Sequence, residues 1–188
     1  MSLEILDNAI RRIPDFPKKG ILFYDITGVL VNPPAFKFCL DKMVELYKDK
    51  KIDAVAGIES RGFIFAAPLA EKLGIPLILI RKKGKLPGDT YTCKYDLEYG
   101  SAEIEVHKAD LKPGQKILVI DDLIATGGTL AASKKLIEQG GAEVLEFFGV
   151  IGLPDLNYEK ILELTNLLSE LNEKSEELEL EWLELSET

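Results

Sequence analysis

The sequence predicts an α/β fold in which an open, mostly parallel β-sheet is flanked by helices. Residues 52–58, 75–80 and 116–120 are apolar along almost their whole length, as strands covered on both faces are. Segments with the spacing of an amphipathic helix lie between these strands. Strands that alternate with helices favour a parallel sheet with helices on both faces. The chain has 188 residues without a linker or an internal repeat, which predicts one domain spanning residues 1–188.

The N-terminal part begins with a short amphipathic stretch and a turn-rich segment at 13–20, after which residues 21–26 are expected to be extended. Pro33 and Pro34 suit the first positions of a helix. The predicted buried face of this helix consists of apolar residues at three-to-four spacing: Phe36, Leu40, Met43, Val44 and Tyr47.

The middle of the chain predicts a strand–helix–strand unit. The strand at 52–58 is followed by helical spacing over 62–73, Gly74 ends that helix, and the strand at 75–80 comes next. Residues 81–100 then carry four lysines and three glycines with almost no periodicity. This stretch is expected to be a long loop with a function of its own.

The C-terminal half continues the pattern. Residues 101–106 alternate as a strand does, a turn follows at 112–115, and residues 116–120 form the third strongly apolar strand. A polar turn at 121–129 is expected to open a helix that stops at Gly140 and Gly141. Residues 144–151 give one more apolar strand.

Composition excludes several classes of protein. The chain is 46% hydrophobic and 29% charged, unlike a disordered protein, and no apolar run approaches the roughly 20 residues of a membrane helix. Cys39 and Cys93 are too few for a disulfide framework or a zinc site. Because the first residues also lack the layout of a secretory signal, we expect a cytoplasmic location.

The net charge of −9 comes from an acidic C-terminal extension at residues 155–188, which holds 11 acidic and two basic side chains. Residues 1–154 are balanced, with 21 of each sign, and this argues against nucleic-acid binding. Asn157 suits the cap of a helix, and residues 178–182 alternate as a strand does. We expect the extension to cover the sheet; binding of a partner is the alternative.

The segment that predicts chemistry is 119–129, Val-Ile-Asp-Asp-Leu-Ile-Ala-Thr-Gly-Gly-Thr. Ligands of open parallel sheets bind beyond the carboxyl ends of the strands, and here an apolar strand leads into a glycine-containing turn at a helix start. The backbone N–H groups of such a turn, the positive end of the helix and threonine hydroxyls all favour a phosphate. The predicted phosphate cradle consists of Ala125, Thr126, Gly127, Gly128 and Thr129.

Asp121 and Asp122 would repel that phosphate if they faced it, so they are expected to hold sugar hydroxyls or a metal-bound sugar. The chain has no G-x-x-x-x-G-K-[ST] motif and no G-x-G-x-x-G after a strand. The usual sites for nucleoside triphosphates and dinucleotides therefore lack their fingerprints.

Segment 119–129 resembles the signature of the type I phosphoribosyltransferases, in which this loop binds the ribose and 5′-phosphate of phosphoribosyl pyrophosphate. Residues 13–17, 20–27, 59–63, 81–88 and 97–100 stand in the order and approximate spacing of the adenine-specific members, so the resemblance runs from about 13 to 153. It implies the family fold, with a small hood within residues 1–35. It also implies conversion of adenine and phosphoribosyl pyrophosphate to AMP and pyrophosphate in purine salvage, with Mg²⁺, by a cytoplasmic homodimer.

The resemblance further implies how the leaving group is held. Arg61 is expected to bind pyrophosphate beside a cis peptide that joins Glu59 to Ser60. The basic residues Arg81, Lys82 and Lys85 follow the next strand and are expected to bind pyrophosphate as well, one of them across the dimer interface; a solvated basic loop is the alternative.

Glu98 resembles the glutamate of the family's flexible loop, which takes or stabilises the proton on the imidazole part of adenine. Tyr99 lies beside it, and residues 83–98 are expected to form a lid. Phe23 is expected to stack on the purine while the backbone of Leu22 and Tyr24 reads its edge; ordinary core packing is the alternative for Phe23. Mg²⁺ is expected to bind through the substrate, with Asp121 and Asp122 as candidate ligands.

Two other functions stay open. Tyr24 stands where many adenine-specific members carry arginine, so hypoxanthine, guanine or xanthine is the alternative base. A non-enzymatic sensor of phosphoribosyl pyrophosphate is the more distant alternative, which we expect to lack the lid base or to carry a DNA-binding extension. Glu98 and the absence of a basic domain favour the enzyme.

Overall fold

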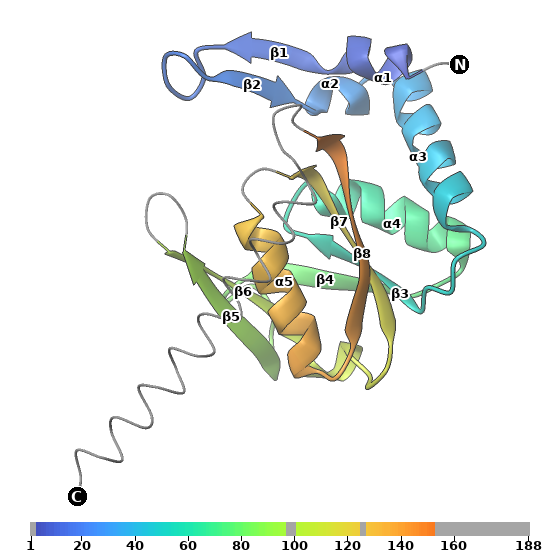
Figure 1. Ribbon diagram of the computed structural model, residues 1–188, viewed down its shortest axis with the longest axis vertical. Coiled ribbons are helices and arrows are strands. Elements are labelled where there is room, and N and C mark those ends of the chain that lie inside the picture. Colours follow the sequence, from blue (N-terminus) through green and yellow to red (C-terminus); the bar gives the residue numbers. More distant parts are fainter. Residues whose placement is uncertain (1–2, 97–100, 125–126, 153–188) are drawn as a thin grey trace, which may run out of the picture.

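A six-stranded sheet in the order β5-β6-β4-β3-β7-β8 forms the body of the protein (Figure 1). The computed structural model describes residues 3–96, 101–124 and 127–152. The strands of this sheet are β3 (Ala54–Ile58), β4 (Leu77–Lys82), β5 (Thr90–Asp96), β6 (Ser101–His107), β7 (Lys116–Ile124) and β8 (Glu143–Gly152). The helices are α1 (Glu4–Ala9), α2 (Thr27–Leu30), α3 (Pro33–Tyr47), α4 (Gly62–Leu73) and α5 (Gly128–Gln139), with a 3₁₀ turn η1 (Lys108–Asp110).

The sheet is mostly parallel, as the sequence predicts. Strand β3 pairs in parallel with β4 on one side and with β7 on the other, and β7 pairs in parallel with β8. Strand β6 runs antiparallel to both β4 and β5. The family fold class expected from the sequence is therefore confirmed.

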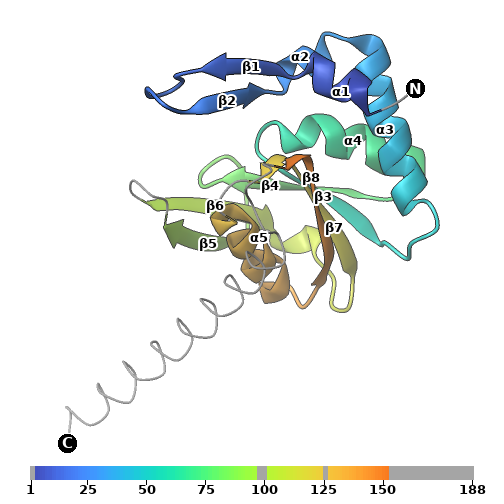
Figure 2. The same cartoon turned by 45° about the horizontal axis from the view of Figure 1, so that its top comes forward.

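Two apolar cores lie on the two faces of the sheet, because successive residues of a strand point to opposite sides. Val55 of β3 packs with α3 and α4, whereas its neighbours Ala54 and Ala56 pack with α5. Leu118 and Ile117 of β7 divide in the same way. Figure 2 shows α4 and α5 on opposite sides of the sheet. The continuous apolar runs of the predicted strands are explained by this double burial.

The structure confirms the predicted helices that begin at 33 and at 62 and the one that follows the turn at 121–129. The Asn32 side chain accepts a hydrogen bond from the Ala35 N–H over 3.2 Å and so caps α3. Gly74 adopts a left-handed conformation, with φ of 68°, and ends α4. Gly140 follows the last residue of α5. Among the described residues, no helix is long and apolar enough to cross a membrane.

The prediction of a loop through residues 81–100 is wrong for two segments, 81–82 and 90–96, which are strands. Strand β4 continues through Arg81 and Lys82, and β5 occupies Thr90–Asp96. The half-buried Tyr91, Cys93 and Tyr95 alternate with exposed residues and pair with β6. This alternation covers only seven residues in a stretch rich in lysine and glycine, which hides the strand from a periodicity argument.

The predicted turn at 121–129 also begins later than expected. Strand β7 extends through Asp121 and Asp122 to Ile124, because β8 lies beside it and supplies partners such as Gly149 for Asp121. Ala125 and Thr126 lie outside the described residues, as does the acidic extension with its predicted helix and strand.

The N-terminal residues form a separate two-stranded ribbon, β1 (Arg11–Pro14) paired antiparallel with β2 (Leu22–Asp25). Figure 1 shows this ribbon apart from the main sheet, next to α1 and α2. Gly28 of α2 approaches α1 so closely that an added Cβ would lie 2.0 Å from the Ala9 carbonyl oxygen. The ribbon matches the small hood that the resemblance implies.

Candidate active site

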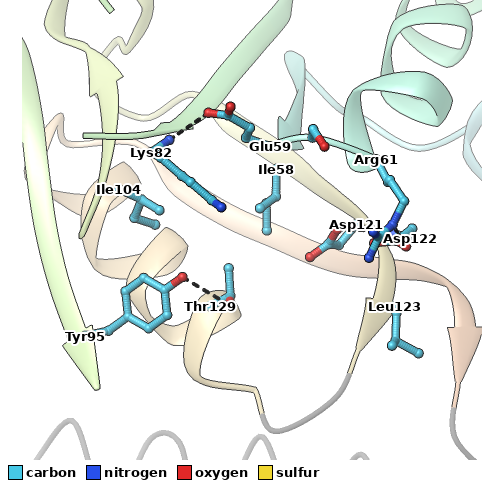
Figure 3. A pocket seen from close by; sticks show the side chains of 11 residues that line it. Ile58, Glu59, Arg61, Lys82, Tyr95, Ile104, Asp121, Asp122, Leu123 and Thr129 are labelled. Carbon is cyan, nitrogen blue, oxygen red and sulfur yellow. Dashed lines mark hydrogen bonds and ion pairs between the residues drawn. The ribbon is translucent and has the colours of Figure 1, made fainter. Parts of the chain in front are cut away.

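A cavity of about 330 Å³ lies where β3, β4 and β7 end at their carboxyl side (Figure 3). Parallel strands that are neighbours in a sheet bring their carboxyl ends to one edge, which is where such folds bind ligands. The cavity brings together seven of the residues that the sequence singles out: Glu59, Ser60, Arg61, Lys82, Asp121, Asp122 and Thr129.

Arg61 reaches the cavity from the junction of β3 and α4. The peptide between Glu59 and Ser60 is cis, as expected. Gly62 begins α4 in close contact with β7, since an added Cβ would lie 2.5 Å from the Ile120 carbonyl oxygen. This contact places the start of α4 beside the end of β7, and the Arg61 Nε donates a hydrogen bond to Asp122 Oδ2.

The two carboxylates at the end of β7 have different surroundings. Asp122 is buried and forms the ion pair with Arg61, whose side chain is about half exposed. The Asp122 N–H donates to Asp121 Oδ1 over 2.8 Å. Burial raises the pKa of Asp121 to about 7, and the adjacent Asp122 carboxylate adds to the rise. Asp121 therefore exchanges a proton near neutral pH, so the charge of this site responds to ligands that bring hydroxyl donors or a cation.

Glu59 holds the end of β4. Its carboxylate accepts from the Lys82 N–H over 2.8 Å and from two nitrogens of Arg81 at 3.3 Å each. Burial by itself raises the pKa of Glu59, but these hydrogen bonds and positive charges outweigh it and leave the pKa below its usual value. With its backbone fixed in this way, Lys82 extends its side chain across the cavity (Figure 3).

The start of α5 faces the same cavity. Gly127 adopts φ of 80° and precedes the first helical residue, Gly128, so the chain turns sharply into the helix. The Thr129 hydroxyl donates to the Tyr95 hydroxyl over 3.4 Å. Helix α5 has 12 residues, and Thr129 of its first turn lines the cavity. An anion placed here meets the positive end of a helix.

The remaining predicted residues that the structure describes are not part of the cavity lining. Arg81 near the end of β4 donates through Nη1 to the carbonyl oxygen of Lys85, which lies in the turn that follows, over 3.1 Å. Leu22, Phe23 and Tyr24 lie on β2 in the hood. Glu98 and Tyr99 fall outside the described residues.

Within the hood, Phe23 and Tyr24 face different surroundings. Phe23 is half-buried and packs edge-to-face on Phe16, with ring centroids 5.1 Å apart. Tyr24 lines a separate cavity of about 310 Å³ beside α1, and Arg12 lies over its ring at 5.8 Å. Only the backbone of Tyr24 is therefore available to a ligand on the Phe23 side of β2.

Sequence reasoning missed four residues of the cavity: Ile58, Tyr95, Ile104 and Leu123. Tyr95 is not predicted because the sequence pattern indicates a loop where the structure has β5. The signal for it was present, since Tyr91, Cys93 and Tyr95 alternate with polar residues. The three apolar residues lie within β3, β6 and β7, and nothing in their spacing separates them from the core.

The family model described as a phosphoribosyl transferase domain matches residues 27–174. A relative from Treponema denticola, named adenine phosphoribosyltransferase, is 70% identical over 162 residues, which cover 86% of this chain and 85% of the relative. The crystal structure of adenine phosphoribosyltransferase from Thermoanaerobacter pseudethanolicus has a TM-score of 0.81 at 44% identity, covering 86% of this chain and 94% of that one.

The enzyme of the same name from Saccharomyces cerevisiae was solved with adenine and D-2,5-dideoxy-2,5-imino-altritol 1,6-bisphosphate. It has a TM-score of 0.78 at 38% identity, covering 84% of this chain and 92% of that one. On the combined ground of the family model, the relatives and the shared fold, this chain belongs to the adenine phosphoribosyltransferase family.

Proposed function

We propose that this protein transfers ribose 5-phosphate from phosphoribosyl pyrophosphate to adenine and releases AMP and pyrophosphate. The observation that carries the proposal is the convergence of Arg61, Lys82, the Asp121–Asp122 pair and the start of α5 on one cavity. These groups match the charges along the donor substrate, since cations suit its pyrophosphate, carboxylates suit its ribose hydroxyls and a helix N-terminus suits its 5′-phosphate. The choice of adenine as the acceptor base rests on the names of the relatives.

We assign binding of the pyrophosphate to Arg61, Ser60, Arg81 and Lys82, together with Lys85 of the turn after β4. Arg61 uses Nε for Asp122, and we assign its terminal Nη groups to the leaving phosphates. The cavity lining around these residues is mostly polar, which suits a highly charged group. Glu59 supports this site by holding Lys82 and Arg81.

For the sugar phosphate, Asp121 and Asp122 bind the ribose hydroxyls, and residues 125–129 bind the 5′-phosphate. Gly127 and Gly128 allow the backbone to approach the phosphate, and Thr129 adds a hydroxyl. The described residues contain no cluster of three or more metal-ligating side chains. That donor set fits Mg²⁺ held mainly by the substrate, with one or both aspartates as ligands, and not a cage made of protein alone.

The reaction breaks the bond between ribose C1 and a pyrophosphate oxygen and forms a bond from C1 to a nitrogen of adenine. Bound Mg²⁺ would supply neutralisation of charge on the leaving pyrophosphate. Arg61 and Lys82 stabilise the same charge, and Glu98 takes the proton that leaves the adenine nitrogen. Phe23 stacks on the adenine ring, with the backbone of Leu22 and Tyr24 at its edge. Tyr99 covers the site together with Glu98.

The test is release of pyrophosphate from phosphoribosyl pyrophosphate with Mg²⁺ and each of adenine, hypoxanthine, guanine and xanthine. We expect turnover with adenine and little with the other bases. Selective turnover of another base would refute the choice of adenine. Binding of phosphoribosyl pyrophosphate without turnover of any base would favour a sensor.

We also propose that the protein is a cytoplasmic homodimer in which a basic residue of the turn after β4 reaches the partner's site. This rests on the resemblance to the family. Light scattering during gel filtration should give twice the monomer mass, and a monomer with full activity would refute it.

A further inference from the structure

Glu105 of β6 is a buried carboxylate that the proposed function does not use. Its residue is only 4% exposed, and a buried charge is costly unless it is well hydrogen-bonded. Glu105 Oε1 accepts from the Lys85 N–H over 2.8 Å and from the Leu86 N–H over 2.7 Å. The Gly84 N–H and the Thr90 hydroxyl also donate to this carboxylate. Four donors from one short stretch of chain therefore converge on one side chain.

Three of these donors belong to the turn that joins β4 to β5, and the fourth, Thr90, is the first residue of β5. The turn contains no helix or strand between Lys82 and Thr90, so no regular backbone hydrogen bonding fixes its shape. Gly84 and Gly88 adopt φ of 82° and 83° within it, a conformation that glycine favours. The strands on its two sides contribute Lys82 and Tyr95 to the cavity. A carboxylate that fixes the turn thus fixes the end of β4 that carries Lys82, whereas Tyr95 lies near the far end of β5.

A second set of contacts links the same turn to the cavity. Arg81 is the cross-strand partner of Glu105, and it donates to the Lys85 carbonyl oxygen and to Glu59. Glu59 in turn holds the Lys82 N–H. The turn is therefore held by two side chains, by Glu105 through its N–H groups and by Arg81 through the Lys85 carbonyl oxygen. Burial raises the pKa of Glu105, but its hydrogen-bond donors outweigh burial and leave the pKa below the usual value, so the group stays ionised at neutral pH.

We propose that Glu105 is a positioning residue that holds the basic turn at 82–86 in the shape that binds pyrophosphate. This inference rests on the proposed function, because it concerns the same site. Glu105 itself contacts no substrate; it acts through the backbone of the turn. An apolar side chain in this place would leave the N–H groups of Lys85 and Leu86 without their acceptor, so the buried carboxylate serves the shape of the turn.

The test compares Glu105→Gln with Glu103→Gln. Glutamine keeps the size of the side chain but replaces one acceptor oxygen with a donor, which faces the turn's own donors. Glu103 is the matched control, since it lies on the same strand and pairs with the Lys83 ammonium at 2.7 Å without accepting from the backbone of the turn through its side chain. Circular dichroism and thermal melting establish that both variants are folded.

Affinity for magnesium pyrophosphate is measured by calorimetry without adenine, and steady-state constants are measured for both substrates. For Glu105→Gln we expect the dissociation constant of magnesium pyrophosphate and the KM of phosphoribosyl pyrophosphate to rise about ten-fold, because a charge-assisted acceptor is lost. The KM of adenine and kcat should stay within about two-fold. For Glu103→Gln all four values should stay within about two-fold.

Several results would overturn the inference. Wild-type affinity for pyrophosphate in folded Glu105→Gln would do so, and so would equal losses in both variants, which would point to charge alone. A fall in kcat together with a rise in both KM values would indicate a merely structural role. If Glu105→Gln does not fold, Thr90→Val removes one donor, and about three-fold weaker pyrophosphate binding is expected, with no change refuting the idea.

The outcome is separable from that of the proposed function. Failure of the wild-type protein to make AMP would overturn the proposed function, while the difference in pyrophosphate affinity would still decide the role of Glu105. A wild-type protein that does not bind magnesium pyrophosphate would refute both.

Discussion

Replacing Gly62 with alanine tests whether the junction between α4 and β7 sets the position of Arg61. The added Cβ would lie 2.5 Å from the Ile120 carbonyl oxygen and 3.3 Å from the Asp121 Cα. Both atoms belong to the backbone of a central strand, which leaves no side chain that can rotate away. An ordinary contact needs 3.4 Å, so the start of α4 must move by about 0.9 Å relative to β7.

That displacement has two separate consequences. Overpacking of this kind costs about 1–3 kcal/mol of unfolding free energy, which corresponds to a fall in Tm of about 2–12 °C for a chain of this size. The same shift moves Arg61 away from Asp122 and from the leaving pyrophosphate. Since a misplacement of about 1 Å can cost about 100-fold in rate, we expect kcat/KM for phosphoribosyl pyrophosphate to fall by about 10- to 100-fold.

The control is Gly140→Ala at the far end of α5, where the added Cβ would lie 2.5 Å from the Leu111 Cβ. It introduces the same methyl group and a clash of the same length, remote from the cavity. We expect both variants to melt at lower temperature and only Gly62→Ala to lose activity in a pyrophosphate-release assay well below the melting range. Equal activity in the two variants would refute the assignment of Arg61 to the site.

Three further predictions concern single residues. The pKa of Asp121 is raised from 3.8 to about 7 in the folded protein, so the folded state binds an extra proton and its stability falls as pH rises between about 4 and 7. Asp121→Asn should remove this part of the pH dependence of the unfolding free energy, measured by urea unfolding at pH 5 to 8. Parallel plots of unfolding free energy against pH for the two proteins would contradict the prediction. Glu98→Gln should lower kcat while leaving the affinity for phosphoribosyl pyrophosphate nearly unchanged, and unaltered turnover would remove Glu98 from the mechanism. Phe23→Ala should raise the KM of adenine by about ten-fold or more with pyrophosphate affinity unchanged, since stacking on a base contributes about 1–3 kcal/mol; an unchanged KM would place the adenine elsewhere.

Most of the fold follows from local rules that one sequence contains. The doubly buried strands at 52–58 and 116–120 and the helix end at Gly74 were predictable because each is written in a few neighbouring residues. Strand β5 and the extension of β7 through Asp122 were not, because both depend on pairing with segments distant in sequence. Polar residues such as Thr92 and Asp121 are tolerated in those strands only because β6 and β8 lie beside them.

The candidate site is likewise predicted only in part by the sequence. Spacing and residue type placed Arg61, Lys82, Asp121 and Asp122 at one sheet edge, and the cavity contains all four. The sequence does not predict which of these groups form hydrogen bonds or ion pairs with each other. Three such features depend on contacts between segments distant in sequence. They are the Arg61–Asp122 ion pair, the hydrogen bond of Glu59 to the end of β4 and the burial of Glu105. They decide which charges are left for a ligand.

The order of strands in the sheet also bears on how the chain matures during synthesis. Strand β7 lies beside β3, although β4, β5 and β6 are made between them. The wall that carries Asp121 and Asp122 is therefore missing until residues 116–124 have left the ribosome and inserted next to a strand made much earlier. A ribosome-bound chain that stops before residue 116 should not retain sugar phosphates, so ligand capture by nascent chains of increasing length would time the completion of the sheet.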